Sequence, residues 1–108
     1  MSKLLKKHLT LIKLFPHVKR ARQKLIIDNA DDELIRLISE CCFNIERYVK
    51  SSDGKKIKCF KRYKKVREFF SKDKKDYKKK KQVLKQSGAG FLNALFAGVL
   101  PIITKLLM

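Results

Sequence analysis

The sequence predicts an all-α protein: a small helical bundle of about three core helices, with a basic extension and an apolar C-terminal helix. Two observations favour this class. Apolar residues recur at spacings of three and four along most of the chain, and no segment alternates apolar and polar residues as a strand does. The hydrophobic share of 44% is too high for simple disorder, and 108 residues suit one small domain with tails.

The first predicted element is an amphipathic N-terminal region, residues 1–16, with a short helix over residues 2–15. Its apolar face is formed by Leu4, His8, Leu11, Ile12 and Phe15. Pro16 ends this helix, because proline disfavours a helical conformation in the residue before it and suits the first turn of the next helix.

A helical core is expected over residues 17–71, and its first helix ends near Asp28. Val18, Ala21 and Leu25 form its expected apolar stripe, with Ile26 as a further candidate.

The clearest element is the next helix, "NADDELIRLISECCFNIERYVK", in which Asn29 is the expected N-cap. Its first turn is acidic, as the positive end of the helix macrodipole favours. The expected buried face is wide and consists of Leu34, Ile35, Ile38, Cys41, Cys42, Ile45, Tyr48 and Val49. "SSDG" ends this helix.

A last core helix is predicted from a stripe of Cys59, Tyr63, Val66 and Phe70, supported by Phe60 and Phe69. After Ser71 this pattern dissolves. Residues 72–87 are interpreted as a lysine-rich linker, and residues 88–108 as an apolar C-terminal tail.

The charge is large and uneven. The chain has 28 Lys and Arg against 10 Asp and Glu, a net charge of +18, and residues 54–86 hold sixteen basic side chains against three acidic ones. Lysine meets phosphate as a mobile point charge, so this composition favours sequence-independent binding of DNA or another polyanion through counterion release. The expected nucleic-acid-binding residues are Lys55, Lys56, Lys58, Lys61, Arg62, Lys64, Lys65, Arg67, Lys72, Lys74, Lys75, Lys78, Lys79, Lys80, Lys81 and Lys85.

Aromatic residues interleave with these lysines, and two interpretations of them remain open. Tyr63, Phe69, Phe70 and Tyr77 could stack on unpaired bases, or the first three could belong to the core, since they fit the helical stripe.

The tail follows the lysines abruptly. Its expected membrane or assembly residues are Phe91, Leu92, Leu95, Phe96, Val99, Ile102, Ile103 and Leu106. Residues 88–104 form an uncharged run of a length at the short edge of a membrane span. The tail could pack as core, insert into a membrane, or drive self-association into a homo-oligomer.

No catalytic residues are expected, and the sequence favours a non-enzymatic protein without cofactor or metal. It contains no nucleophile elbow, no glycine-rich phosphate loop and no Cys/His spacing typical of metal ligands. The three cysteines are interpreted as small core residues in a reducing compartment. Lysines interrupt the apolar run at the N-terminus, so it is not expected to be a secretory signal.

The join "KKKKQVLKQSGAGFLNALFAGVLPIITKLL" resembles the C-terminal part of the adenovirus minor core protein mu precursor, in which a basic DNA-condensing region meets glycines and then an apolar tail. The whole chain, including "NADDELIRLISECCFNIERYV", also resembles small proteins of polinton and adintovirus-like elements. This resemblance implies a virion core protein in the host nucleus, with proteolytic processing at Gly88, Ala89 or Gly90.

The hypothesis is therefore a DNA-binding and DNA-condensing protein, a virion core component whose tail faces a membrane or the capsid interior. One alternative is a membrane-active or tail-anchored cationic protein. A second alternative is a histone-like dimerising DNA-binding protein, because short, long and short helices are expected over residues 17–71.

Overall fold

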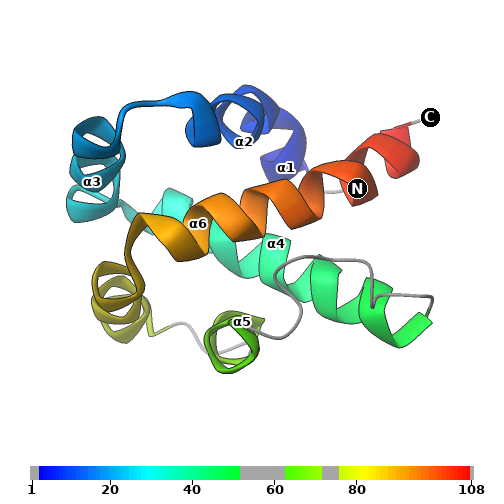
Figure 1. The fold of residues 1–108 in the computed structure, drawn as a ribbon. Helices are drawn as coiled ribbons and strands as arrows, with labels where there is room; N and C mark the ends of the chain where they lie inside the picture. The colour runs from blue at the N-terminus through cyan, green and yellow to red at the C-terminus, as the bar shows by residue number, and fades with distance from the viewer. Residues whose placement is uncertain (1–2, 52–62, 72–75, 108) are drawn as a thin grey trace.

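All regular structure that the computed structural model describes is helical, which confirms the all-α class (Figure 1). The described residues are 3–51, 63–71 and 76–107. The elements are α1 (Lys3–Lys7), α2 (Leu9–Leu14), the 3-10 helix η1 (Phe15–His17), α3 (Arg20–Asp28), α4 (Asp32–Ser51), α5 (Lys64–Ser71) and α6 (Tyr77–Leu107).

The longest helix, α6, is divided by Gly88, whose φ of 75° and ψ of −170° are not helical. We call residues 77–87 the basic segment of α6 and residues 89–107 its apolar segment. The basic segment is helical and packs on the bundle through the buried Leu84. The interpretation of residues 72–87 as a linker is therefore wrong for residues 77–87, while residues 72–75 lie outside the described part.

We predict that Gly88→Ala lowers the free energy of unfolding by about 1–3 kcal/mol, because this combination of φ and ψ is essentially restricted to glycine. A Cβ atom at this position would meet no atom within 4 Å, so the effect is conformational rather than steric. Denaturant titration measures it, and Ser87→Ala is the matched control at the neighbouring position. Equal stability of both variants would show that the kink does not depend on glycine.

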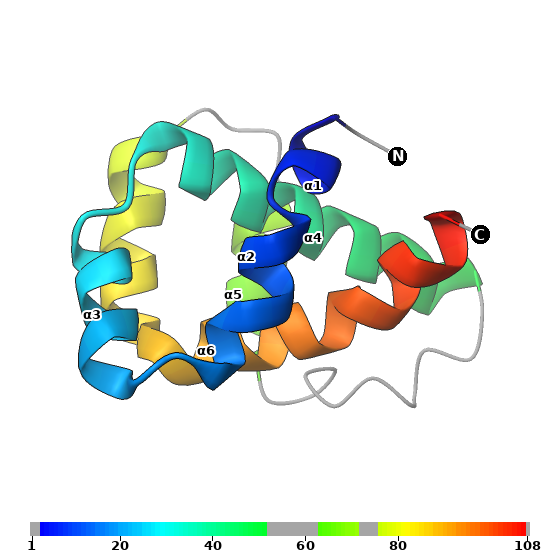
Figure 2. The same cartoon turned by 90° about the horizontal axis from the view of Figure 1, so that it is seen from above.

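The apolar segment of α6 lies in the middle of the molecule (Figures 1 and 2). Helix α6 as a whole contacts α2, η1, α3, α4 and α5. The buried side chains of the apolar segment are Phe91, Leu92, Leu95, Phe96, Val99 and Ile102. They form one core cluster with α4 and with Leu5, Ile12 and Phe15 from the N-terminal region. The expectation of a core confined to residues 17–71 is therefore wrong. The physical reason is that the tail carries the longest apolar surface of the chain, and burying it removes that surface from water.

Aromatic rings connect α5 and η1 to the apolar segment of α6. Phe70 stacks on Phe91 with 5.8 Å between ring centroids, and Tyr63 contacts Phe91 edge-on at 5.5 Å. Phe15 meets Phe96 edge-on at 5.5 Å. Phe70 is fully buried, while Tyr63 and Phe69 are half-buried against the core, which confirms the core interpretation of these residues.

The predicted buried face of α4 is confirmed for five residues, all of which are fully buried: Ile35, Ile38, Cys41, Cys42 and Ile45. Leu34 is half-buried, and Leu37 joins the core although the stripe did not include it. The side chains of Tyr48 and Val49 lie outside the described part, as do Cys59 and Phe60.

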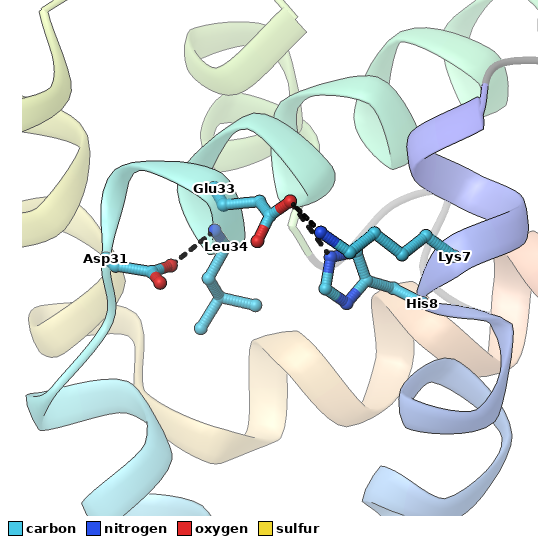
Figure 3. Close-up of polar contacts among 5 residues, drawn as sticks. All are labelled: Lys7, His8, Asp31, Glu33 and Leu34. Carbon is cyan, nitrogen blue, oxygen red and sulfur yellow. Dashed lines mark hydrogen bonds and ion pairs between the residues drawn. The ribbon is translucent and has the colours of Figure 1, made fainter.

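The N-cap of α4 is Asp31 rather than the expected Asn29. The Leu34 N–H donates to Asp31 Oδ1 at 2.8 Å (Figure 3), whereas the Asn29 amide donates to the Leu25 carbonyl and so caps the end of α3. The acidic first turn also binds the N-terminal region. Lys7 Nζ lies 2.8 Å from Glu33 Oε1, and this ammonium group holds the pKa of the Glu33 carboxyl below its usual range.

Helix α3 buries a face that the sequence predicted only in part, since of the expected stripe Ile26 is half-buried against the core. Leu25 is 61% exposed, and the buried residues are Gln23 and Ile27. The Gln23 amide donates to the Phe15 carbonyl at 2.7 Å and to Asn93 Oδ1 of α6 at 3.1 Å. These two partners satisfy the buried amide, which explains why a polar residue takes a core position.

Helices α3, α4 and α5 have 9, 20 and 8 residues, the short, long and short order that prompted the histone-like alternative. In the structure, α5 and α6 of the same chain pack against α4. In the described part of α4, the apolar face from Ile35 to Ile45 is therefore buried by helices of the same chain.

Candidate nucleic-acid interface

The structure describes eight of the sixteen cations that were expected to bind nucleic acid. They are Lys64, Lys65, Arg67, Lys78, Lys79, Lys80, Lys81 and Lys85. The other eight lie outside the described residues: Lys55, Lys56, Lys58, Lys61, Arg62, Lys72, Lys74 and Lys75.

Two of the described cations are buried in the bundle and do not form part of a binding surface. Arg67 is 1% exposed, and its Nη1 lies 2.9 Å from Glu46 Oε1 of α4. Lys80 is 5% exposed, and its Nζ donates to Ser39 Oγ at 3.0 Å and to the Phe70 carbonyl at 3.3 Å. The assignment of Arg67 and Lys80 to phosphate contacts is therefore corrected, because both side chains connect helices inside the fold.

The remaining described cations are at the surface. Lys64, Lys65, Lys78, Lys79 and Lys85 are exposed. Lys81 is partly exposed and forms an ion pair with Asp32 Oδ1 at 2.9 Å, which connects the basic segment of α6 to the start of α4.

Sequence reasoning missed a group of cations on α3 and just before it. Lys19, Arg20, Arg22 and Lys24 are all exposed, within the segment "KRARQK". The apolar stripe of this segment predicts a helix of the core. The density of cations in this segment was the signal that could have identified a surface helix.

Helix α3 and the basic segment of α6 lie at the same end of the molecule, opposite the C-terminus (Figures 1 and 2). They meet at the Gly88 kink, where a pocket of about 490 Å³ opens between them. Its lining residues are Arg20, Ala21, Lys24, Ile27, Asp28, Lys85, Gly88, Ala89 and Gly90. The fold thus brings two cation-rich parts of the chain, α3 with the residue before it and the basic segment of α6, to one end of the molecule. We call the exposed and partly exposed cations of these parts the basic end: Lys19, Arg20, Arg22, Lys24, Lys78, Lys79, Lys81 and Lys85.

The three residues considered for proteolytic processing lie at the kink. Gly88 has the positive φ, Ala89 is half-buried and Gly90 is exposed. A Cβ atom at Gly90 would lie 3.1 Å from Tyr63 Oη, so this glycine also permits a close approach of the Tyr63 side chain.

Six of the tail residues expected to meet a membrane are core residues in the described structure: Phe91, Leu92, Leu95, Phe96, Val99 and Ile102. The side chains of Ile103 and Leu106 lie outside the described part. Residues Tyr77–Ile102 are long and apolar enough to cross a bilayer, a criterion that the core helix of a soluble protein also meets.

The described residues give little support to a reactive thiol or a metal site. Cys41 and Cys42 are buried free thiols, and burial raises the pKa of the Cys41 thiol, which opposes formation of a reactive thiolate. No three His, Cys, Asp or Glu side chains gather there as a metal site would require.

No protein-family model matches the chain, and neither a curated protein nor a solved structure shows significant similarity to it.

Proposed function

We propose that the protein binds DNA through the backbone phosphates, without reading the base sequence, and that the basic end is the main contact surface. The observation that carries this proposal is the gathering of exposed cations from α3 and the basic segment of α6 at one end of the fold. A net charge of +18 favours association with a polyanion. Lysine and arginine at the surface neutralise phosphates and release condensed counterions.

The proposal extends to a biological role. A protein that neutralises DNA charge suits a virion core, where a genome must be condensed, and the resemblance to polinton-like elements and to the adenovirus core precursor supports this role and a nuclear location. In this proposal the apolar segment of α6 has a structural task, because its side chains support both helices of the basic end.

The test measures affinity for several unrelated duplexes against salt concentration. We expect equal affinities and a steep negative slope, with about 0.9 units in the log–log plot for each phosphate contact. Changing Lys19, Arg20, Arg22 and Lys24 together to Gln is expected to reduce the slope by up to roughly 3–4 units.

The matched control changes Lys3, Lys13, Arg36 and Arg47 to Gln. Like the test variant, this control loses two lysines and two arginines. All four side chains are exposed, and they lie on α1, α2 and α4. We expect a smaller loss of slope. A slope near zero for the unmodified protein would contradict DNA binding. Equal losses of slope in the two variants would contradict the assignment of the basic end as the main contact surface.

Membrane activity is the second candidate function, favoured by the length and hydropathy of Tyr77–Ile102. Since the apolar segment of α6 forms the core, insertion would require it to leave the bundle. Release of trapped dye from neutral vesicles by the full chain is the result that would favour this candidate over DNA binding.

A further inference from the structure

We propose that the pocket at the Gly88 kink seats one phosphodiester group. This inference rests on the proposed function and makes it more specific, because it names the point of the basic end where a phosphate is held rather than merely attracted. Helix α3 lies beside the junction of the two segments of α6 (Figure 2), and residues of both line the pocket.

The cations of the pocket suit a phosphate in number and in type. Arg20 and Lys24 are four residues apart on α3, so their side chains lie on adjacent turns of one face, and Lys85 reaches the pocket from α6. A guanidinium group donates two parallel hydrogen bonds to phosphate oxygens, and the two ammonium groups add charge. Asp28 is the one carboxylate among the lining residues, so three cations and one anion leave a net charge of +2.

The rest of the lining leaves room for an anion. Gly88 and Gly90 carry no side chain, and a Cβ atom at Gly88 would meet nothing within 4 Å, so a ligand has room to approach the backbone. Arg20, Lys24 and Lys85 are exposed, so their charged groups are free to reach a ligand that enters from solvent. A volume of about 490 Å³ leaves space for the sugar attached to the phosphate.

Two sources offer this chemistry, the backbone of DNA and the headgroup of an anionic phospholipid. The experiment therefore has two arms, one with a short DNA duplex and one with phosphatidylglycerol vesicles, and uses the full chain in both.

The key variant changes Arg20, Lys24 and Lys85 to Gln. Its control changes Lys19, Arg22 and Lys79 to Gln, which removes one arginine and two lysines from the same regions but from positions that do not line the pocket. With equal losses of charge, we expect the pocket variant to bind the duplex about tenfold more weakly than the control, since it also loses charge-assisted hydrogen bonds. Asp28→Asn is expected to strengthen binding.

A second readout does not depend on the variants. In the unmodified protein, titration with the duplex is expected to shift the backbone amide signals of Gly88 and Gly90 in nuclear magnetic resonance spectra. If the pocket variant bound the vesicles more weakly than its control but bound the duplex as tightly as its control, the lipid headgroup would be the source of the phosphate.

Equal affinities of the pocket variant and its control, with unmoved glycine signals, would overturn the phosphate pocket. Salt-dependent DNA binding by the basic end would then still stand. Failure of the unmodified protein to bind DNA at all would instead overturn the proposed function, so the two failures are distinguishable.

Discussion

Leu95→Asp is expected to unfold the domain. Leu95 is fully buried in the apolar segment of α6, one helical turn from Phe91, Leu92 and Val99, which are also fully buried. An unpaired carboxylate there loses its hydration without gaining a partner, which destabilises by several kcal/mol and is comparable to the whole stability of about 5–15 kcal/mol that such a domain has. Loss of cooperative thermal melting and of helical circular dichroism measures the effect.

The matched control for this variant is Leu25→Asp, which introduces the same charge at a leucine that is 61% exposed. We expect this control to melt close to the unmodified protein, because surface substitutions usually change stability by less than about 0.5 kcal/mol. If Leu95→Asp instead melted like its control, the apolar segment would not be the core, and a membrane role for it would gain support. Deletion of residues 90–108 is expected to unfold the chain for the same reason.

The second large effect is expected for Ile38→Asp, in the centre of the buried face of α4. Ile38 is fully buried in the cluster that joins α4 to α6. The substitution removes a packed side chain and places a charge among apolar neighbours, so we expect a loss of several kcal/mol, enough to abolish a cooperative denaturation curve.

The control for Ile38→Asp is Phe43→Asp on the same helix, because Phe43 is half exposed. The neighbouring Ser39 is unsuitable, since its hydroxyl accepts a hydrogen bond from Lys80 and an aspartate there would meet that ammonium group. Similar denaturation midpoints for the variants at positions 38 and 43 would contradict the orientation of α4.

The helical class and the face of α4 could be predicted because both depend on local periodicity. Ile38, Cys41 and Ile45 recur at the spacing of a helical turn, so any helix through them presents one apolar stripe. Short helices carry weaker patterns. On α3 the stripe through Leu25 predicted the wrong position for the core face, because the buried Gln23 bonds to Asn93 on α6, seventy positions away in the sequence.

The candidate site was only partly predictable for a related reason. Composition predicted phosphate as the ligand, but it did not separate exposed lysines from buried ones. Lys80 faces Ser39 and Phe70, and Arg67 faces Glu46, and both contacts exist only after the helices pack. The cations of α3 were missed because nothing in the sequence placed them beside Lys85.

By itself, then, the sequence determined that the chain is helical and that α4 has one wide apolar face. It also determined that the surface of the protein must be strongly cationic. Only the tertiary structure decided that the apolar segment of α6 is the centre of the core and that Arg20, Lys24 and Lys85 meet at the Gly88 kink. The physical reason is the range of the interactions. Helical periodicity is set by residues within about two turns of one another, whereas burial and the meeting of charges depend on contacts between different helices. Arg20 and Lys24 are more than sixty positions from Lys85 in the sequence.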